Sequence, residues 1–469
     1  MGFNSLEFVF FLPVVFAIYW IIPQKWRWYF LLLASYWFYM SWDPRFGVLL
    51  AGTTVIDWWA ALRMDRCDTQ HQKKPWLVLS ILSNLGCLAA FKYSAFFYNT
   101  GAWIASGFKG SSPEYMTALI IPVGLSFYVF HSLGYTIDVY RGKFPAEKNL
   151  TIFALFVSFF PQLVAGPIAR FNDLGVQFHT PKFLKTEMLI SGTRLAVWGF
   201  FKKIVIADRL ADYVNPFFAH PENYNGLTLL LAGFFFVVQV YCDFSGYSDI
   251  ATGIARFFGF ELKLNWRRPL LSKSLHEFWS RNHISMTSWF RDYLYIPLGG
   301  KKVAYPRWLL NLFLVFLISG LWHGASWTFV VWGAMHGIVF ILEILLKGKI
   351  RFRFLGWPYL ILFHTISLIA FRAESFQSLG IFYRKIFGFD WSVTRTWGEL
   401  RMLHDLLPLF FALTGIAFLF AKEYTEENGT FIRLRGYENH LKPAFYTLLF
   451  VFIFAMGKFS ANEFIYFHF

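Results

Sequence analysis

The chain has 469 residues, of which 57% are hydrophobic, 22% aromatic and 15% charged, and its formal net charge is +15. This composition is too apolar for a soluble globular protein, so we expect a polytopic membrane protein. The basic residues gather in short loops such as 63–74, as the positive-inside bias predicts, so the charge does not indicate nucleic-acid binding. Cys67, Cys87 and Cys242 form no CxxC pair. We therefore expect no disulfide framework, no metal site and no bound cofactor.

Apolar stretches of spanning length, about 20 residues each, recur from one end of the sequence to the other. They lie at 6–22, 26–42, 45–62, 76–98, 115–137, 150–166, 187–207, 225–257, 308–322, 325–346, 355–372, 404–421 and 441–458. The first stretch follows no basic region and precedes no small-residue cleavage site, so we expect a retained helix. The pattern predicts one integral all-α domain over 1–469, a bundle of about 11–14 membrane helices, some broken or re-entrant.

Several apolar stretches carry polar residues that hydrophobicity does not explain. These are Asp138, Gln162 between Pro161 and Pro167, Lys202, Lys203, Tyr241, Asp243 and Ser245. Each ionisable group inside a bilayer costs about 2.5–3.5 kcal/mol on insertion scales, so it should face a partner or water. Interhelical hydrogen bonds and ion pairs are the simpler explanation for any one of them. Together they predict a polar funnel or tunnel through the middle of the bundle.

The stretch from 259 to 305 is the longest weakly apolar part of the sequence. Between 267 and 302 it carries seven basic residues, Arg267, Arg268 and Arg281 among them, against two acidic ones. Such a segment cannot simply span the bilayer, so we expect an interfacial or a re-entrant helix. His276, Trp279 and His283 follow helical spacing, which predicts one shared face toward a pocket, with Arg281 on the other face.

Residues 319–337 place His323 and His336 in an otherwise apolar run. If the run were one continuous helix, the two rings would stand roughly 20 Å apart on different faces and could not serve one reacting atom. Gly324 permits a break in the helix after His323, and Trp322 supplies an aromatic wall. We therefore assign the chemistry to His323 and a structural role to His336, as a satisfied histidine near a helix end.

Five stretches are similar to motifs of one known family. They read IDVYRG (137–142), FFPQLVAGPIAR (159–170), DFSGYSDIATG (243–253), EFWSRNHISMTSWFRDYLYIPLGG (277–300) and GLWHGASWTFVVWGAMHG (320–337). In these motifs the chain resembles the membrane-bound O-acyltransferases, specifically the bacterial alginate O-acetylase branch. The likeness is most specific over about 110–345 and is more diffuse in the helices of 355–469.

The resemblance implies a multi-pass enzyme of the bacterial cytoplasmic (inner) membrane with a funnel that reaches a central histidine. In the family motifs the invariant histidine corresponds to His323, and a second polar position corresponds to His283. The resemblance further implies acetyl-CoA as a cytoplasmic donor substrate and a glycan acceptor at the outer face. A separate esterase-like acetyltransferase outside the membrane is the implied protein partner, and membrane lipids surround the bundle.

Acyl transfer from a thioester to a hydroxyl needs a base for the hydroxyl proton and donors for the developing oxyanion. A neutral imidazole suits the base role near neutral pH. The sequence has no GxSxG elbow, and Cys242 lies in an apolar stretch typical of packing, so direct transfer without an acyl-enzyme is our interpretation.

Further residues receive supporting roles. We expect a pocket or channel lined or supported by Trp322, Trp279, Asp243, Ser245, Tyr241, Asp138, Gln162, Asn282 and His336. We expect the donor's phosphates to be bound by Arg267, Arg268, Arg281, Lys202 and Lys203.

Two other classes of function remain open at this point, a transporter of a lipid-linked glycan and a non-catalytic scaffold of a glycan synthase.

Overall fold

The computed structural model describes residues 1–107, 120–346, 356–403, 406–429 and 438–458. Within these ranges the regular elements are helices and there is no strand, which confirms the predicted all-α class. Five helical stretches are long and apolar enough to cross a membrane. They are Gln70–Ala105, Gly226–Phe257, Tyr305–His323, Trp327–Leu345 and Leu406–Glu427. The expected total of about 11–14 membrane helices stays a prediction.

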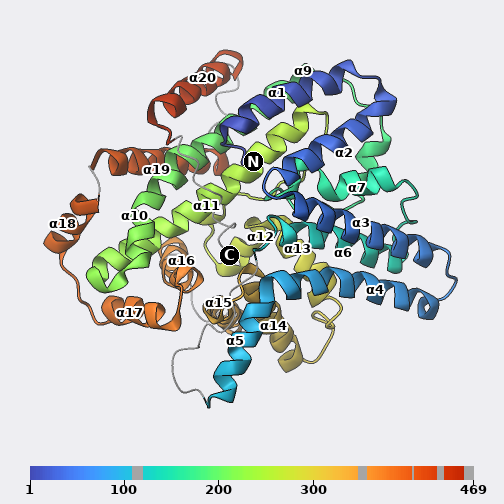
Figure 1. Ribbon diagram of the computed structural model, residues 1–469. Helices are drawn as coiled ribbons and strands as arrows, with labels where there is room; N and C mark the ends of the chain where they lie inside the picture. Colours follow the sequence, from blue (N-terminus) through green and yellow to red (C-terminus); the bar gives the residue numbers. More distant parts are fainter. Residues whose placement is uncertain (108–119, 347–355, 404–405, 430–437, 459–469) are drawn as a thin grey trace. The chain divides into compact units, whose positions relative to one another are not determined.

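The chain divides into two compact units, and Figure 1 follows their helices in chain order. Unit 1 comprises residues 1–192 and 251–263, and unit 2 comprises 193–250 and 264–469. The division falls twice within a helix, once in α9 (Thr186–Phe200) and once in α11 (Gly226–Phe257). The expectation of one integral domain stays a prediction beside this division.

Unit 1 is built from the helices that precede α9. They are α1 (Leu6–Ile21), α2 (Gln24–Met40), α3 (Pro44–Asp65), α4 (Gln70–Leu88), the π-helical η1 (Ala89–Tyr93), α5 (Ser94–Ala105), α6 (Leu125–Tyr140), α7 (Leu150–Ser158), α8 (Phe160–Leu163) and the 3₁₀ turn η2 (Gly175–His179). The helix predicted over 150–166 is interrupted as expected, because Pro161 lies in the first turn of a new helix.

Unit 2 holds the remaining helices. They are η3 (Phe201–Ala207), α10 (Asp208–Ala219), η4 (Pro221–Asn223), η5 (Pro269–Leu271), α12 (Leu275–Arg281), α13 (Ile284–Phe290), η6 (Arg291–Tyr295), α14 (Tyr305–His323), α15 (Trp327–Leu345), α16 (Gly356–Arg372), α17 (Phe376–Phe387), α18 (Val393–Leu403), α19 (Leu406–Glu427) and α20 (Glu438–Met456). Every apolar stretch predicted from the sequence overlaps a helix of one unit or the other.

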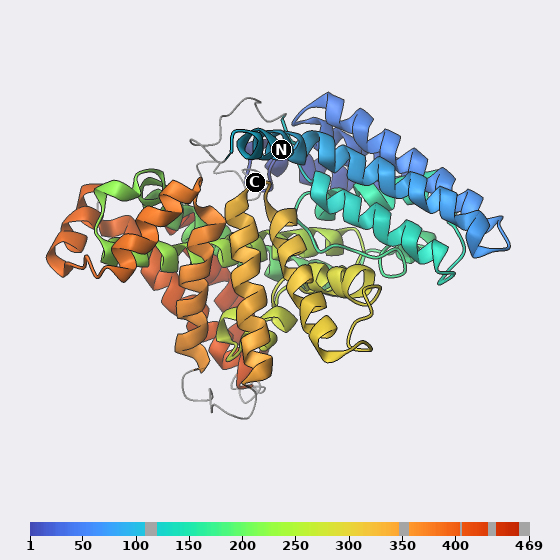
Figure 2. The ribbon, with the colours of Figure 1, turned by 90° about the horizontal axis from the view of Figure 1, so that it is seen from below.

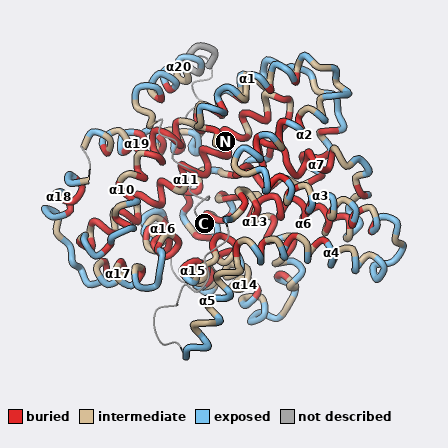
Figure 3. Tube along the Cα trace, viewed as in Figure 1, coloured by how far each residue is buried: buried red, intermediate tan, exposed pale blue. Residues whose placement is uncertain are grey.

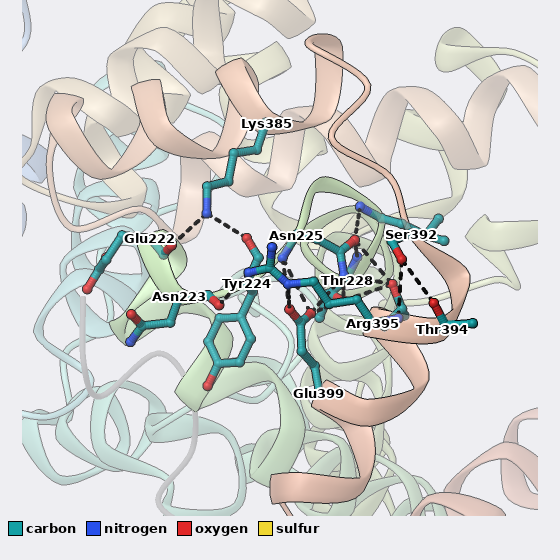
Figure 4. A network of polar contacts seen from close by, with 12 residues as sticks. Glu222, Asn223, Tyr224, Asn225, Thr228, Lys385, Ser392, Thr394, Arg395 and Glu399 are labelled. Carbon is teal, nitrogen blue, oxygen red and sulfur yellow. Dashed lines mark hydrogen bonds and ion pairs between the residues drawn. The ribbon is translucent and has the colours of Figure 1, made fainter.

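Helix α11 is the most enclosed of the long apolar helices: 72% of its most apolar window is buried, and Figure 3 shows it red over much of its length. Its first turn is held by the polar network of Figure 4. Asn225 donates to Glu399 from its backbone N at 3.2 Å and from Nδ2 at 2.9 Å. The Thr228 hydroxyl donates to the same carboxylate at 2.5 Å, and Arg395 donates to it at 2.7 Å. The Asn225 side-chain oxygen in turn accepts from the backbone N of Leu227 at 2.9 Å and of Thr228 at 3.3 Å, which satisfies donors that the start of a helix would otherwise leave unpaired.

Helices α14 and α15 form a hairpin whose two arms lie side by side, and α16 packs on α15 (Figure 2). A Cβ at Gly320 would come within 2.4 Å of the Phe329 carbonyl oxygen, and a Cβ at Gly333 within 2.5 Å of the Phe316 oxygen. Small residues therefore let the two backbones approach closely, as at many membrane helix interfaces. Ser326 caps the start of α15, so the chain turns between His323 and Trp327.

Candidate active site

Unit 2 contains a cavity of about 60 Å³ with mostly apolar walls. Its lining comes from α11, from the segment 266–286, and from α14, α15 and α16. The lining residues are Val237, Val240, Tyr241, Trp266, Leu270, Phe278, Trp279, Asn282, His283, Met286, His323, Trp332, His336, His364, Leu368 and Phe371. Six residues selected from the sequence are among them, namely Tyr241, Trp279, Asn282, His283, His323 and His336.

His323 and His336 both line this cavity, which corrects the expectation that they could not serve one site. The premise of one continuous helix is wrong, because α14 ends at His323 and α15 runs back beside it. Trp332 lies against both rings, with its centroid 5.2 Å from that of His323 and 4.6 Å from that of His336. His336 lies in the middle of α15, and its Nε2 is 3.2 Å from the Ser367 hydroxyl.

His283 reaches the cavity by a route that helical spacing did not foresee. Helix α12 ends at Arg281, and His283 takes the left-handed conformation with φ of 45° before α13 begins. His276 is exposed, so His276, Trp279 and His283 do not share one face, and Arg281 is buried rather than turned outward. Asn265 holds the new helix in place by accepting from the backbone N of Ile284 at 2.9 Å and of Ser285 at 3.0 Å. These bonds offset a backbone strain of about 1–3 kcal/mol.

Aromatic rings surround the two histidines. The Trp322 ring lies 4.8 Å from His323 and 6.3 Å from His283, measured between centroids, so it bridges the pair. Phe244 packs edge-on against His283 at 4.6 Å.

Burial lowers the pKa of His283 to about 3, because the charged imidazolium would lose its hydration. The ring is therefore neutral at physiological pH and can orient a hydrogen bond without adding charge.

Lys202, Lys203, Asp243 and Ser245 form buried polar clusters outside the residues that line the cavity. The Lys203 ammonium contacts Asp243 at 2.6 Å and Asp208 at 2.8 Å. The Lys202 ammonium donates to Ser245 at 2.9 Å and contacts Asp249 at 2.7 Å. Both lysines are at most 3% exposed. Both ammonium groups are thus already paired with carboxylates, and a role of these lysines at the donor's phosphates stays a prediction.

The three arginines expected at the phosphates differ in their surroundings. Arg281 is buried between Glu277 at 2.6 Å and Glu427 at 2.9 Å, and Arg268 contacts Glu427 at 2.8 Å. Arg267 is exposed. Arg268 and Arg281 thus connect the segment before α13 to the end of α19, and Arg267 alone of the five predicted cations is exposed at the surface.

The remaining predicted residues have local partners. Tyr241 donates its hydroxyl to the buried carboxylate of Glu423 on α19. Asp138 and Gln162 belong to unit 1, where Asp138 contacts Lys143 at 2.8 Å and Gln162 donates to the Phe156 carbonyl at 2.7 Å. We therefore assign these last two to the interior of unit 1.

The sequence analysis missed Trp266, His364 and Asn265. His364 lines the cavity from α16, its ring centroid 5.4 Å from that of His336. A titratable residue in the apolar stretch 355–372 was the signal for it, the same signal that selected His323. Trp266 stacks on His283 at 5.7 Å. No signal in the sequence marks Asn265, whose role depends on the fold around it.

The arrangement joins several imidazoles to a cavity with mostly apolar walls. Apolar walls lower the local dielectric constant and strengthen hydrogen bonds made between them. A neutral imidazole there can take a proton from a hydroxyl group, and indole and imidazole N–H groups can donate to a carbonyl oxygen. The described residues contain no cluster of three or more His, Cys, Asp or Glu side chains that could bind a metal ion.

Comparison with known proteins places the cavity within a matched family region. Residues 147–383 match the family model described as MBOAT, the membrane-bound O-acyltransferase family. The chain is 40% identical over 400 residues to a probable alginate O-acetylase of Azotobacter vinelandii, covering 84% of this chain and 80% of that protein. It is 40% identical over 394 residues to the Pseudomonas aeruginosa protein of the same name, with coverages of 83% and 75%.

A further relative carries a different name. The peptidoglycan O-acetyltransferase of Helicobacter pylori is 33% identical over 419 residues, covering 80% of this chain and 78% of that protein. All the residues that line the cavity fall inside the matched range 147–383.

Proposed function

From the fact that this chain belongs to the membrane-bound O-acyltransferase family, and is therefore a multi-pass membrane O-acyltransferase, we propose that it acetylates a glycan of the bacterial cell envelope. The donor in this proposal is cytoplasmic acetyl-CoA, and the protein lies in the cytoplasmic (inner) membrane. The observation that carries the proposal is the apolar cavity with His323 and His283 in its wall. The names of the relatives, alginate O-acetylase and peptidoglycan O-acetyltransferase, support a glycan acceptor.

His323 is the general base in this proposal. As the acceptor's hydroxyl oxygen attacks the thioester carbonyl, the His323 imidazole takes the hydroxyl proton. The new C–O bond forms, the C–S bond breaks, and the proton passes from the imidazolium to the leaving thiolate. The products are an ester and free coenzyme A, so no electrons are exchanged. His283, neutral and held by the chain around it, orients the reacting groups.

A transfer assay with labelled acetyl-CoA tests the proposed acyl donor directly. Purified protein in liposomes receives acetyl-CoA with a labelled acetyl group and a soluble glycan, and the free thiol and the labelled ester are measured together. We expect thiol release in proportion to transferred label. A transporter or a scaffold would release no thiol above the protein-free control, and that result would contradict the proposal.

A partner protein completes the proposal for polymeric acceptors. The described connections between the helices contain short helices such as α17 and α18 and no domain-sized lobe, since an independent domain needs about 50 residues. An extracytoplasmic esterase-like acetyltransferase would receive the acetyl group or pass it to the sugar hydroxyls. We expect this chain alone to acetylate polymer poorly and the added partner to restore transfer. Strong polymer acetylation by the chain alone would refute the partner and favour a direct acceptor.

A further inference from the structure

Two indole N–H groups in the cavity wall lack an acceptor. Trp279 and Trp332 both line the cavity, and their side chains are buried, at 8% and 4% exposure. Among the residues that the structure describes, neither Nε1 atom has a hydrogen-bond partner. A buried donor without a partner is unfavourable, so such groups in a binding cavity indicate a ligand that completes them.

Three other tryptophans of unit 2 donate their indole N–H to an acceptor within the protein. Trp266 donates to the Ser248 hydroxyl at 3.3 Å, Trp308 to the Tyr295 hydroxyl at 2.8 Å, and Trp357 to the Leu270 carbonyl at 2.7 Å. Trp266 lines the same cavity, so burial in this wall does not by itself prevent pairing. The unpaired donors are thus a property of Trp279 and Trp332.

An indole N–H can only donate, so its missing partner is an atom with a lone pair, such as a carbonyl oxygen. The Trp332 ring lies 5.2 Å from His323 and 6.1 Å from Trp279, measured between centroids. Both indole rings therefore belong to the same cavity wall as the proposed base, where the thioester carbonyl must come for its carbon to be attacked. The carbonyl oxygen gains negative charge at that moment, and fixed donors in a water-excluded site stabilise it strongly.

We propose that the indole N–H groups of Trp332 and Trp279 donate to the carbonyl oxygen of the acyl donor and stabilise its oxyanion in the transition state. The identity of the acyl donor in this proposal rests on the proposed function. Both tryptophans belong to the wall of the cavity, and the two N–H groups are buried there.

The test replaces each indole by a phenyl ring, which removes the N–H group and keeps an aromatic side chain. Trp332→Phe should lower kcat by roughly 10²-fold and leave KM for the acyl donor within a few-fold, because an oxyanion donor acts in the transition state. Trp279→Phe should change kcat in the same direction. The double variant should lose less than the product of the two single losses, since both groups serve one oxygen. Trp397→Phe, at an exposed tryptophan of α18, is the matched control and should keep the kinetics of the wild type.

A second replacement separates hydrogen bonding from packing. With 3-benzothienylalanine in place of Trp332, the bicyclic shape stays and only the N–H is lost, so kcat should fall as in the phenylalanine variant. Wild-type kcat in this protein would overturn the proposal, because the wall alone would then be sufficient. The assay first establishes a donor that the wild type uses. If that acyl donor is not acetyl-CoA, the proposed function is wrong about the donor. The same variants, tested with the thioester that the wild type does use, still decide the role of the indole N–H groups.

Discussion

Two buried polar regions of unit 2 differ in how far their hydrogen bonds are satisfied. At the start of α11, the Glu399 carboxylate accepts from Asn225, Thr228 and Arg395 (Figure 4). In the cavity, the N–H groups of Trp279 and Trp332 lack a partner within the described chain. The first arrangement is typical of groups that stabilise a fold, whereas the second leaves capacity for a substrate. Burial of polar groups therefore marks a site only where their partners are missing.

The largest effect should come from His323 in the cavity. His323→Ala should reduce acetyl transfer by roughly 10²–10⁴-fold, the range expected for loss of a general base. The loss of a buried ring beside Trp322 and Trp332 also leaves a cavity, so the thermal unfolding temperature in detergent should fall as well and is measured beside the activity. Labelled acetyl transfer in liposomes and a melting curve of the same preparation measure both. Near-wild-type transfer would exclude His323 as the base.

The next effect should come from the buried ion-pair cluster around Lys203, and it should be a loss of stability rather than of activity. Lys203→Met leaves the buried Asp208 and Asp243 without their shared cation, a change that typically costs about 3–5 kcal/mol. We expect low yield and a lower unfolding temperature. The double variant Lys203→Met, Asp243→Asn removes the charge of one of the two carboxylates that lost their shared cation and should recover part of the loss. A stable single variant with changed donor affinity would instead restore Lys203 to phosphate binding.

The sequence was sufficient for the helices and for part of the site. Runs of apolar residues located the helices because lipid and core demand the same composition. A titratable residue inside one of those runs pointed to His323, whereas helical spacing and a family motif in the weakly apolar stretch 259–305 pointed to His283. The geometry of the cavity needed the fold. Hydropathy continues through 319–337, so the turn between α14 and α15 that brings His336 beside Trp332 left only Gly324 as a signal. The bend at His283 depends on Asn265, a contact that spacing along one helix does not encode.

The Glu399 network should affect stability alone. Glu399→Gln keeps the side chain's shape but weakens the charge-assisted bonds to Arg395 and to the start of α11, so we expect a loss of about 1–3 kcal/mol. Glu374→Gln, at an exposed glutamate between α16 and α17, is the control. Unfolding in detergent with increasing denaturant measures the difference. A fall in kcat at unchanged stability would contradict the separation between the two regions.

The smallest effect tests a histidine that belongs to both kinds of region. His336 has one nitrogen, Nε2, within 3.2 Å of the Ser367 hydroxyl, whereas Nδ1 has no partner among the described residues. Ser367→Ala removes the hydroxyl that bonds to Nε2 of His336, and one neutral hydrogen bond of this kind contributes about 0.5–1.5 kcal/mol. We expect a loss of stability of that size and kcat/KM within about fivefold of the wild type, because a structural His336 stays packed between Trp332 and Phe363. A loss of activity of 10²-fold at an unchanged unfolding temperature would instead place His336 among the residues that act on the substrate.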